Sequence, residues 1–105
     1  MDKKKKLWKE YNSLNDRTIY EIKKLFKKMG TDTITLSGDL KRFLIRELQI
    51  GDYESLVVDK AFIINGHLFV EGYTRLSDKY ITIDAIDLEF RDLMSLYNIV
   101  EVLSE

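Results

Sequence analysis

Apolar residues recur at three- and four-residue intervals in two segments of the chain, and this spacing predicts two amphipathic α-helices. The first helix covers residues 16–30, and its apolar stripe consists of Ile19, Ile22, Phe26 and Met29. Gly30 suits the left-handed conformation that commonly follows the last helical residue. The second helix covers about residues 87–103, and its stripe consists of Phe90, Leu93, Met94, Tyr97, Val100 and Leu103.

Upstream of the first helix, Leu7, Tyr11 and Leu14 follow a similar spacing, so residues 4–12 are also expected to be helical. The polar residues that follow allow a break, which would make residues 1–14 a separate helical arm. A continuous helix from about residue 4 to residue 29 would instead be roughly 40 Å long. A domain of this size has a radius of gyration of about 13 Å. Part of a continuous helix would therefore project, and both arrangements stay open.

The clearest strand signal is Asn65-Gly66 between two apolar runs, which predicts a β-hairpin with a type I′ turn. The two-residue loop fixes the expected pairs: Ile64 with His67, Phe62 with Phe69, Lys60 with Glu71, and Val58 with Tyr73. One face of this hairpin is assigned to the core, with Val57, Ala61, Ile63, Leu68 and Val70. The other face is aromatic and carries the Lys60–Glu71 pair, which favours contact with water.

Three further segments complete the predicted fold. Alternation over Tyr80–Asp84 predicts a third strand, and Thr31–Ser37 predicts a short one. Residues 39–50 fit a short helix better than a strand, although both are open. The fold class is therefore α+β: an antiparallel sheet of three to four strands, arranged as a meander, with the N- and C-terminal helices on one face. Besides the hairpin residues, the expected core contains Ile22, Phe26, Ile81, Ile83, Leu93, Tyr97 and Val100.

The composition is that of an ordinary globular protein, with 45% hydrophobic and 33% charged residues in 105. We expect one domain, residues 1–105. The absence of cysteine excludes disulfides, thiolate metal sites and cysteine nucleophiles. The longest apolar run is Ala61–Ile64, too short to span a bilayer, and the basic start lacks the apolar segment of a signal peptide. The expected location is the cytoplasm, without membrane insertion.

Little in the sequence indicates chemistry. The acidic residues Asp84, Asp87, Glu89 and Asp92 are better explained as caps of the C-terminal helix than as metal ligands. His67 follows the hairpin turn, and no motif places a nucleophile or carboxylate beside it, so it is interpreted as a surface residue. We therefore expect a non-enzymatic protein without a catalytic residue, metal, cofactor or evident small-molecule ligand.

Charge is unevenly distributed along the chain. Residues 1–30 hold ten Lys/Arg and four Asp/Glu, whereas residues 31–105 hold seven and fourteen. The leading hypothesis is a non-enzymatic protein–protein interaction or accessory module that forms a homodimer or serves as an accessory subunit, with the contacts Phe62, Phe69, Tyr73, Trp8 and Tyr11. The alternative is a nucleic-acid-binding accessory protein using Lys3, Lys4, Lys5, Lys6 and Lys9. A pI near 5.9 counts against this alternative.

The N-terminal helix, the hairpin segment Val58–Val70 and the acidic C-terminal helix together resemble a group of short uncharacterised proteins encoded by gut Bacteroidetes. The resemblance covers about half of the chain. It implies an α+β fold and carries over no activity and no functional residue. Residues 31–55 do not take part in it.

Overall fold

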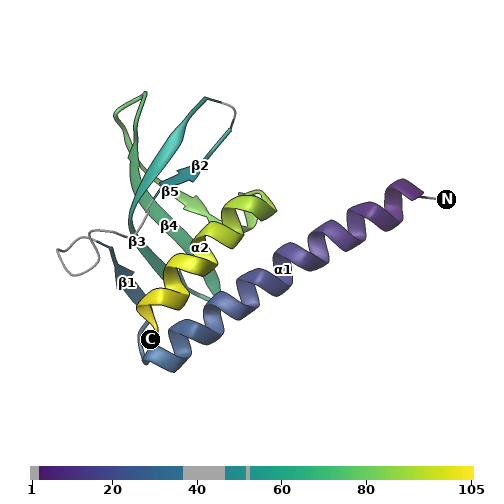
Figure 1. The fold of residues 1–105 in the computed structure, drawn as a ribbon, viewed down its shortest axis with the longest axis horizontal. Helices are drawn as coiled ribbons and strands as arrows, with labels where there is room; N and C mark the ends of the chain where they lie inside the picture. Colours follow the sequence, from purple (N-terminus) through teal and green to yellow (C-terminus); the bar gives the residue numbers. More distant parts are fainter. Residues whose placement is uncertain (1–2, 37–46, 52) are drawn as a thin grey trace.

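Two helices cover one face of an antiparallel sheet, which confirms the α+β class (Figure 1). The computed structural model describes residues 3–36, 47–51 and 53–105, and the side chains from residue 14 onward within these ranges. The elements in chain order are α1 (Lys3–Met29), β1 (Thr33–Thr35), β2 (Glu47–Gln49), β3 (Ser55–Ile64), β4 (His67–Thr74), β5 (Tyr80–Asp84), the 3₁₀ turn η2 (Ala85–Asp87) and α2 (Phe90–Leu103). None of the described helices is long and apolar enough to cross a membrane.

The sheet has one more strand than predicted within the described residues. Its order is β1-β3-β4-β5, and β2 also pairs with β3. Glu47–Gln49 form β2, so the helix predicted over residues 39–50 is wrong at this end. Leu48 is buried opposite Leu56, and this pairing overrides a spacing that also fits a helix. Residues 37–46 of that prediction lie outside the described part of the chain.

The hairpin register is confirmed from the turn as far as Lys60, which pairs with Glu71. Asn65 and Gly66 both have positive φ, 51° and 80°, as the predicted turn requires. Beyond Lys60 a β-bulge shifts the register, so that Val57, not Val58, lies opposite Tyr73. One extra residue reverses which side chains face the core. Val58 is therefore buried and Val57 is not, which corrects the prediction.

Most of the predicted core is confirmed. The fully buried members are Ile22, Phe26, Ala61, Leu68, Val70, Leu93 and Val100. The half-buried members that pack against them are Ile63, Ile81, Ile83 and Tyr97. Three leucines outside the predicted core are also buried, namely Leu48, Leu56 and Leu96. Leu48 lies on β2 opposite Leu56 of β3, beyond the bulge. Leu96 is buried because the inward face of α2 is displaced from the predicted stripe. The core thus lies between the sheet and the two helices.

α1 is one continuous helix of 27 residues, about 40 Å long, so of the two arrangements left open by the sequence the structure has the one without a break. Its C-terminal end lies over β3, where Lys27 and Ile63 line one hollow. Further toward the N-terminus, Tyr20 lies beside Asp84, the last residue of β5. The helix therefore crosses the sheet from its β1 edge to its β5 edge.

The first part of α1, residues 3–14, leaves the rest of the structure, and we call it the arm (Figure 1). Directly after the arm, the Asn15 side-chain amide donates a hydrogen bond of 3.5 Å to the carbonyl of Leu88. Leu88 follows β5 by one short turn. The arm thus departs past the β5 edge of the sheet.

Candidate interaction surfaces

The aromatic residues on the outer face of the sheet are largely occupied with one another. The rings of Phe62 and Phe69 stack at 5.5 Å between centroids, and the Lys60 amine lies 5.7 Å from the Phe62 ring. Tyr73, which is 54% exposed, makes an edge contact with Tyr80 at 4.8 Å. Because the Phe rings face each other, they do not offer a flat platform on which a nucleic-acid base could stack.

A polar network separates these two aromatic pairs. The Glu71 carboxylate accepts hydrogen bonds from the Thr82 hydroxyl at 2.7 Å and the Tyr80 hydroxyl at 3.1 Å, and forms an ion pair with Lys60 at 3.1 Å. These donors lower the pKa of Glu71. The Tyr80 hydroxyl lies equally close to Asp59, at 3.1 Å. Shielding from water, together with the two carboxylates, raises the pKa of Tyr80.

The outer face is consequently a mixed surface, on which the Lys60–Glu71 pair lies among the aromatic rings as the sequence indicated. Carboxylates outnumber amines around the network, which opposes the approach of a phosphate backbone. Its hydrogen bonds tie β3, β4 and β5 together side by side. The face can make polar contacts to a protein, but its groups already have partners.

A hollow of about 330 Å³ lies between α1 and the end of β5. Tyr20, Ile86 and His67 line it, and His67 Nδ1 is 3.2 Å from Asp84 Oδ2. Sequence reasoning missed this pair. The register of β5 against β4 would have revealed it. Asp84 lies opposite Phe69, and Phe69 and His67 are two residues apart and so share one face of β4. The pair joins the start of β4 to the end of β5 at the margin of this hollow.

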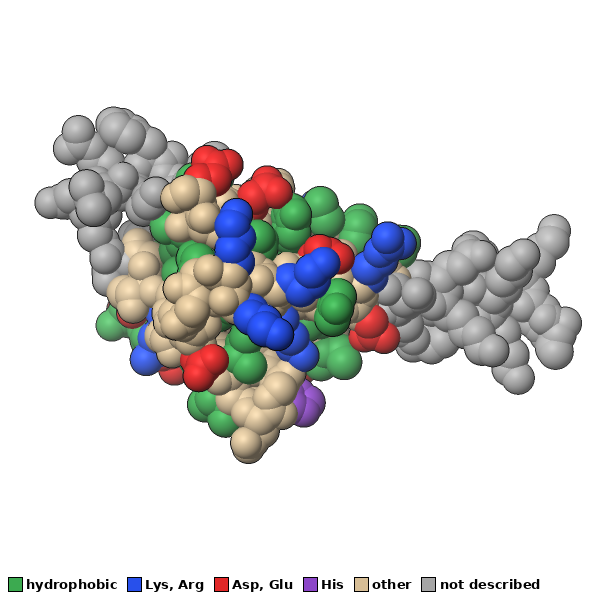
Figure 2. Space-filling model, turned by 90° about the horizontal axis from the view of Figure 1, so that it is seen from below, with side chains coloured by type: hydrophobic (Ala, Val, Ile, Leu, Met, Phe, Trp, Pro, Cys, Tyr) green, Lys and Arg blue, Asp and Glu red, His purple; other side chains and the backbone are tan. Residues whose placement is uncertain are grey.

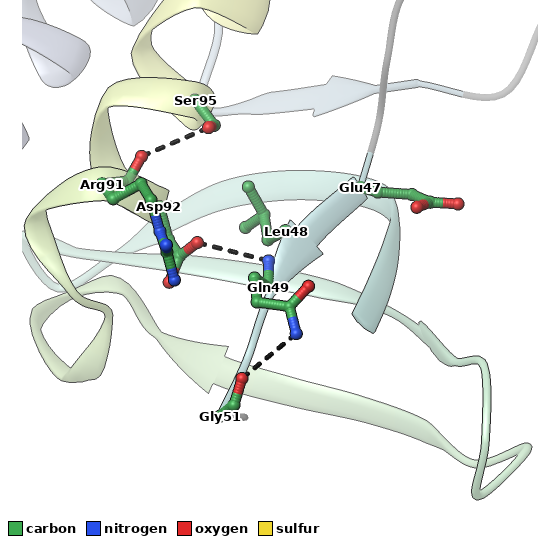
Figure 3. A pocket seen from close by; sticks show the side chains of 7 residues that line it. All are labelled: Glu47, Leu48, Gln49, Gly51, Arg91, Asp92 and Ser95. Atoms are coloured by element: carbon green, nitrogen blue, oxygen red, sulfur yellow. Dashed lines mark hydrogen bonds between the residues drawn. The ribbon is translucent and has the colours of Figure 1, made fainter. Parts of the chain in front are cut away.

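A hollow of about 550 Å³ lies between β2 and the start of α2 (Figure 3). Asp92 is buried there and points toward β2, where its Oδ1 accepts a hydrogen bond from the Gln49 amide at 3.2 Å. Burial raises the pKa of Asp92. The Ser95 hydroxyl donates to the Arg91 carbonyl at 3.2 Å, within α2. The bond between Asp92 and Gln49 holds β2 against α2.

The acidic residues around η2 and α2 act partly as predicted. Asp84 caps η2 by accepting a hydrogen bond from the Ile86 amide at 3.1 Å. Glu89 precedes α2 without a side-chain cap bond, and Asp92 is used by β2. Among the described side chains, no group of three or more potential ligands could hold a metal ion.

Glu54 fixes the turn that leads into β5. Its carboxylate accepts hydrogen bonds from the amides of Ser55, Leu76 and Ser77 and from the Ser77 hydroxyl, at distances of 2.8–3.1 Å. These donors, the Leu76 amide first, lower the pKa of Glu54 to about 2. A carboxylate thereby joins the loop before β3 to the turn after β4, and sets where β5 begins.

We expect Glu54→Gln to lower stability at neutral pH and to flatten its loss in acid. The ordinary pKa is 4.5 and the folded value is about 2, so the ionised group stabilises the fold above the ordinary value and ceases to do so as pH falls toward 2. Urea midpoints measured at about pH 7 and pH 3 test this linkage. The matched control is Glu89→Gln, whose side chain makes no cap bond. A Glu54→Gln protein with the pH dependence of the unaltered chain would contradict the assignment.

The described part of α1 presents a basic surface with exposed apolar groups. Lysine and arginine side chains gather along it, with hydrophobic side chains and carboxylates among them; one carboxylate is Glu21, which pairs with Lys24 (Figure 2). Leu14 is 49% exposed and Tyr20 is 60% exposed. The predicted contacts in the arm lie outside the described side chains, and the helix backbone alone places them there: Lys3, Lys4, Lys5, Lys6, Trp8, Lys9 and Tyr11.

Comparison with known proteins does not add a family to these observations. No family model matches the chain, and no curated protein or solved structure matches it. The resemblance to the Bacteroidetes proteins therefore stays a prediction.

Proposed function

We propose that this protein is a non-enzymatic interaction module that associates with a second copy of itself through the arm. The observation that supports this is the course of α1, whose first residues leave the structure without a described element beside them (Figure 1). The sequence continues its apolar spacing through this stretch, at Leu7, Tyr11 and Leu14.

A helix in this position gains from a partner. The arm continues a helix that is already nucleated where α1 packs on the sheet, but most helical stability in proteins comes from tertiary packing, and no described element supplies it to the arm. The first turn of α1 contains no acidic residue, and its lysines stand at the positive end of the helix dipole. An acidic surface that covers the arm would offset both costs.

The charge distribution favours a second copy as this partner. Residues 1–30 carry a net charge of +6, ten minus four, and residues 31–105 carry −7, seven minus fourteen. The arm of one copy therefore complements the remainder of another. Association of this kind would leave a small net charge in the assembly, as in the single chain.

Sedimentation equilibrium of the full chain tests the proposal. We expect a mass that rises with concentration toward twice the 12.4 kDa of one chain. The double variant Tyr11→Ser with Leu14→Ser should weaken dimerisation by roughly tenfold or more, since each removes apolar contact area. Leu76→Ser is the matched control, because Leu76 is exposed at the β4–β5 turn, away from the arm.

Two results would overturn this function. The first is a chain that stays monomeric at the highest concentration studied. The second is tight binding of mixed-sequence DNA or RNA that collapses between about 50 and 200 mM salt, as phosphate contacts require, and that is lost when the lysines of residues 3–6 are replaced. That second result would establish the nucleic-acid alternative instead.

A further inference from the structure

We infer that β5 is the strand through which two copies join, by antiparallel pairing with β5 of the second copy into one continuous sheet. This inference rests on the proposed self-association and specifies its contact. β5 ends the strand order, with β4 on one side and no described strand on the other. An open edge of this kind is a template for pairing with another chain.

The backbone groups of β5 point the right way for such pairing. In an antiparallel ladder, successive residues bond alternately to the two neighbouring strands. The Thr74 amide donates to the Lys79 carbonyl at 2.8 Å, so Lys79, Ile81 and Ile83 direct their backbone groups toward β4. Tyr80, Thr82 and Asp84 then direct theirs outward. No described strand lies at this edge to pair with the amide and carbonyl of Thr82.

The strand also lacks the features that usually protect an edge. Natural edges are blunted by lysine, proline, a bulge or a covering segment. Between Tyr80 and Asp84, β5 contains only Ile81, Thr82 and Ile83, and its pairing with β4 is unbroken. The opposite edge differs, since β1 and β2 have three residues each and the bulge in β3 separates their partners.

A two-fold axis through Thr82 makes β5 complementary to itself. Thr82 then faces Thr82 of the copy, and Ile81 faces Ile83 on the helix-covered side, where both are half-buried in the single chain. The same axis places Lys79, which precedes β5 in one copy, near Asp84 and Asp87 at the end of β5 in the other copy. Opposite charges therefore meet twice, and an isologous contact of this kind closes as a dimer.

The arm supplies the area that a short strand pair lacks. Stable interfaces bury more than about 1,000 Å² in total, which five residues on each side do not reach alone. α1 crosses the sheet toward β5, and Asn15 contacts Leu88 just beyond the end of that strand. A copy paired at β5 would therefore lie beneath the departing arm. Strand pairing and arm contact would form one interface.

Cysteine cross-linking tests the pairing, because the natural chain has no cysteine. Hydrogen-bonded residues opposite each other in antiparallel strands have Cα atoms about 5.5 Å apart, which suits a disulfide. Under mild oxidation we expect Thr82→Cys to form a covalent dimer roughly tenfold faster than Thr35→Cys, since pairing raises the local thiol concentration. Thr35 is a matched control, because it is an exposed threonine on the outer face of β1 at the opposite edge.

A second variant tests the same contact without oxidation. Thr82→Lys should weaken dimerisation roughly tenfold, because like charges would lie directly opposite, whereas Thr35→Lys should not. Thr82 is exposed and its hydroxyl donates to Glu71, so the lysine variant loses one hydrogen bond and should stay folded with a slightly lower thermal midpoint. If the natural chain dimerises but neither Thr82 variant differs from its Thr35 control, the β5 pairing is wrong and self-association stands. If the natural chain is monomeric, both fail.

Discussion

Replacing Val58 with aspartate should abolish cooperative unfolding, while the same replacement at Val57 should leave the protein folded. Val58 is 0% exposed opposite Gly72, and an aspartate there would bury an unpaired charge that its short side chain cannot carry to water. Val57 is half-buried opposite Tyr73 on the outer face. There we expect a cost of about 1–2 kcal/mol, mainly from lower strand propensity and lost packing.

Circular dichroism with a urea titration of both variants separates the two faces. The comparison depends on the bulge, because without it Val57 would be the buried residue and Val58 the outer one. A folded Val58→Asp protein beside an unfolded Val57→Asp protein would show that the register shift is absent.

Gly72→Ala should destabilise the protein by about 3 kcal/mol or more, the upper range for overpacking. A Cβ at this position would lie 2.0 Å from the Val57 carbonyl oxygen, 2.8 Å from its carbon and 3.0 Å from the Val58 Cα. All three are backbone atoms of the strand that contains the bulge, so no side-chain rotation relieves the clash. The strands themselves would have to separate.

Gly30→Asn is the control for Gly72→Ala in urea unfolding. Gly30 has a φ of 72° with open space around its Cβ position, and asparagine tolerates that conformation. We expect this control to cost less than about 1 kcal/mol, since only conformational preference changes. Equal losses in the two variants would mean that the close approach of β4 to the bulge is not what requires glycine at position 72.

The hairpin could be predicted from the sequence because its signal is local. Asn65-Gly66 fixes the turn, the turn fixes the pairs as far as Lys60–Glu71, and both are confirmed. The bulge could not be predicted from the sequence, because it requires no glycine or proline. It is recognised only from the pairing of β3 with β4. A shift of one residue was enough to exchange the predicted roles of Val57 and Val58.

Longer-range features were less accessible for the same reason. The apolar spacing around Leu48 fits a helix as well as a strand. Its pairing with Leu56 of β3 decides for the strand. α1 continues through a polar stretch that would also suit a break, and its first residues form a projecting arm. The sequence allowed both a break and a continuous helix. His67 and Asp84 are in contact because β5 pairs with β4, and no sequence motif predicts this contact.

The candidate surface shows a similar division. The aromatic residues on the outer face were placed correctly relative to the hairpin, but their stacking and the Glu71 network depend on β5. Among the described strands β5 pairs with β4 alone, and this follows from strand order, which alternation within single segments does not reveal. The arm and this open edge lie on the same side, and the interface proposed for the dimer depends on that coincidence.

Amide hydrogen exchange of the natural chain at low and high protein concentration tests self-association most directly. We expect slower exchange at high concentration in two places together, the amides of residues 3–14 and the outward amides of β5 near Thr82, because these become covered or hydrogen-bonded in the dimer. Exchange on β1, at the opposite edge, should not change. Exchange rates in the arm and β5 that do not depend on concentration would contradict the account.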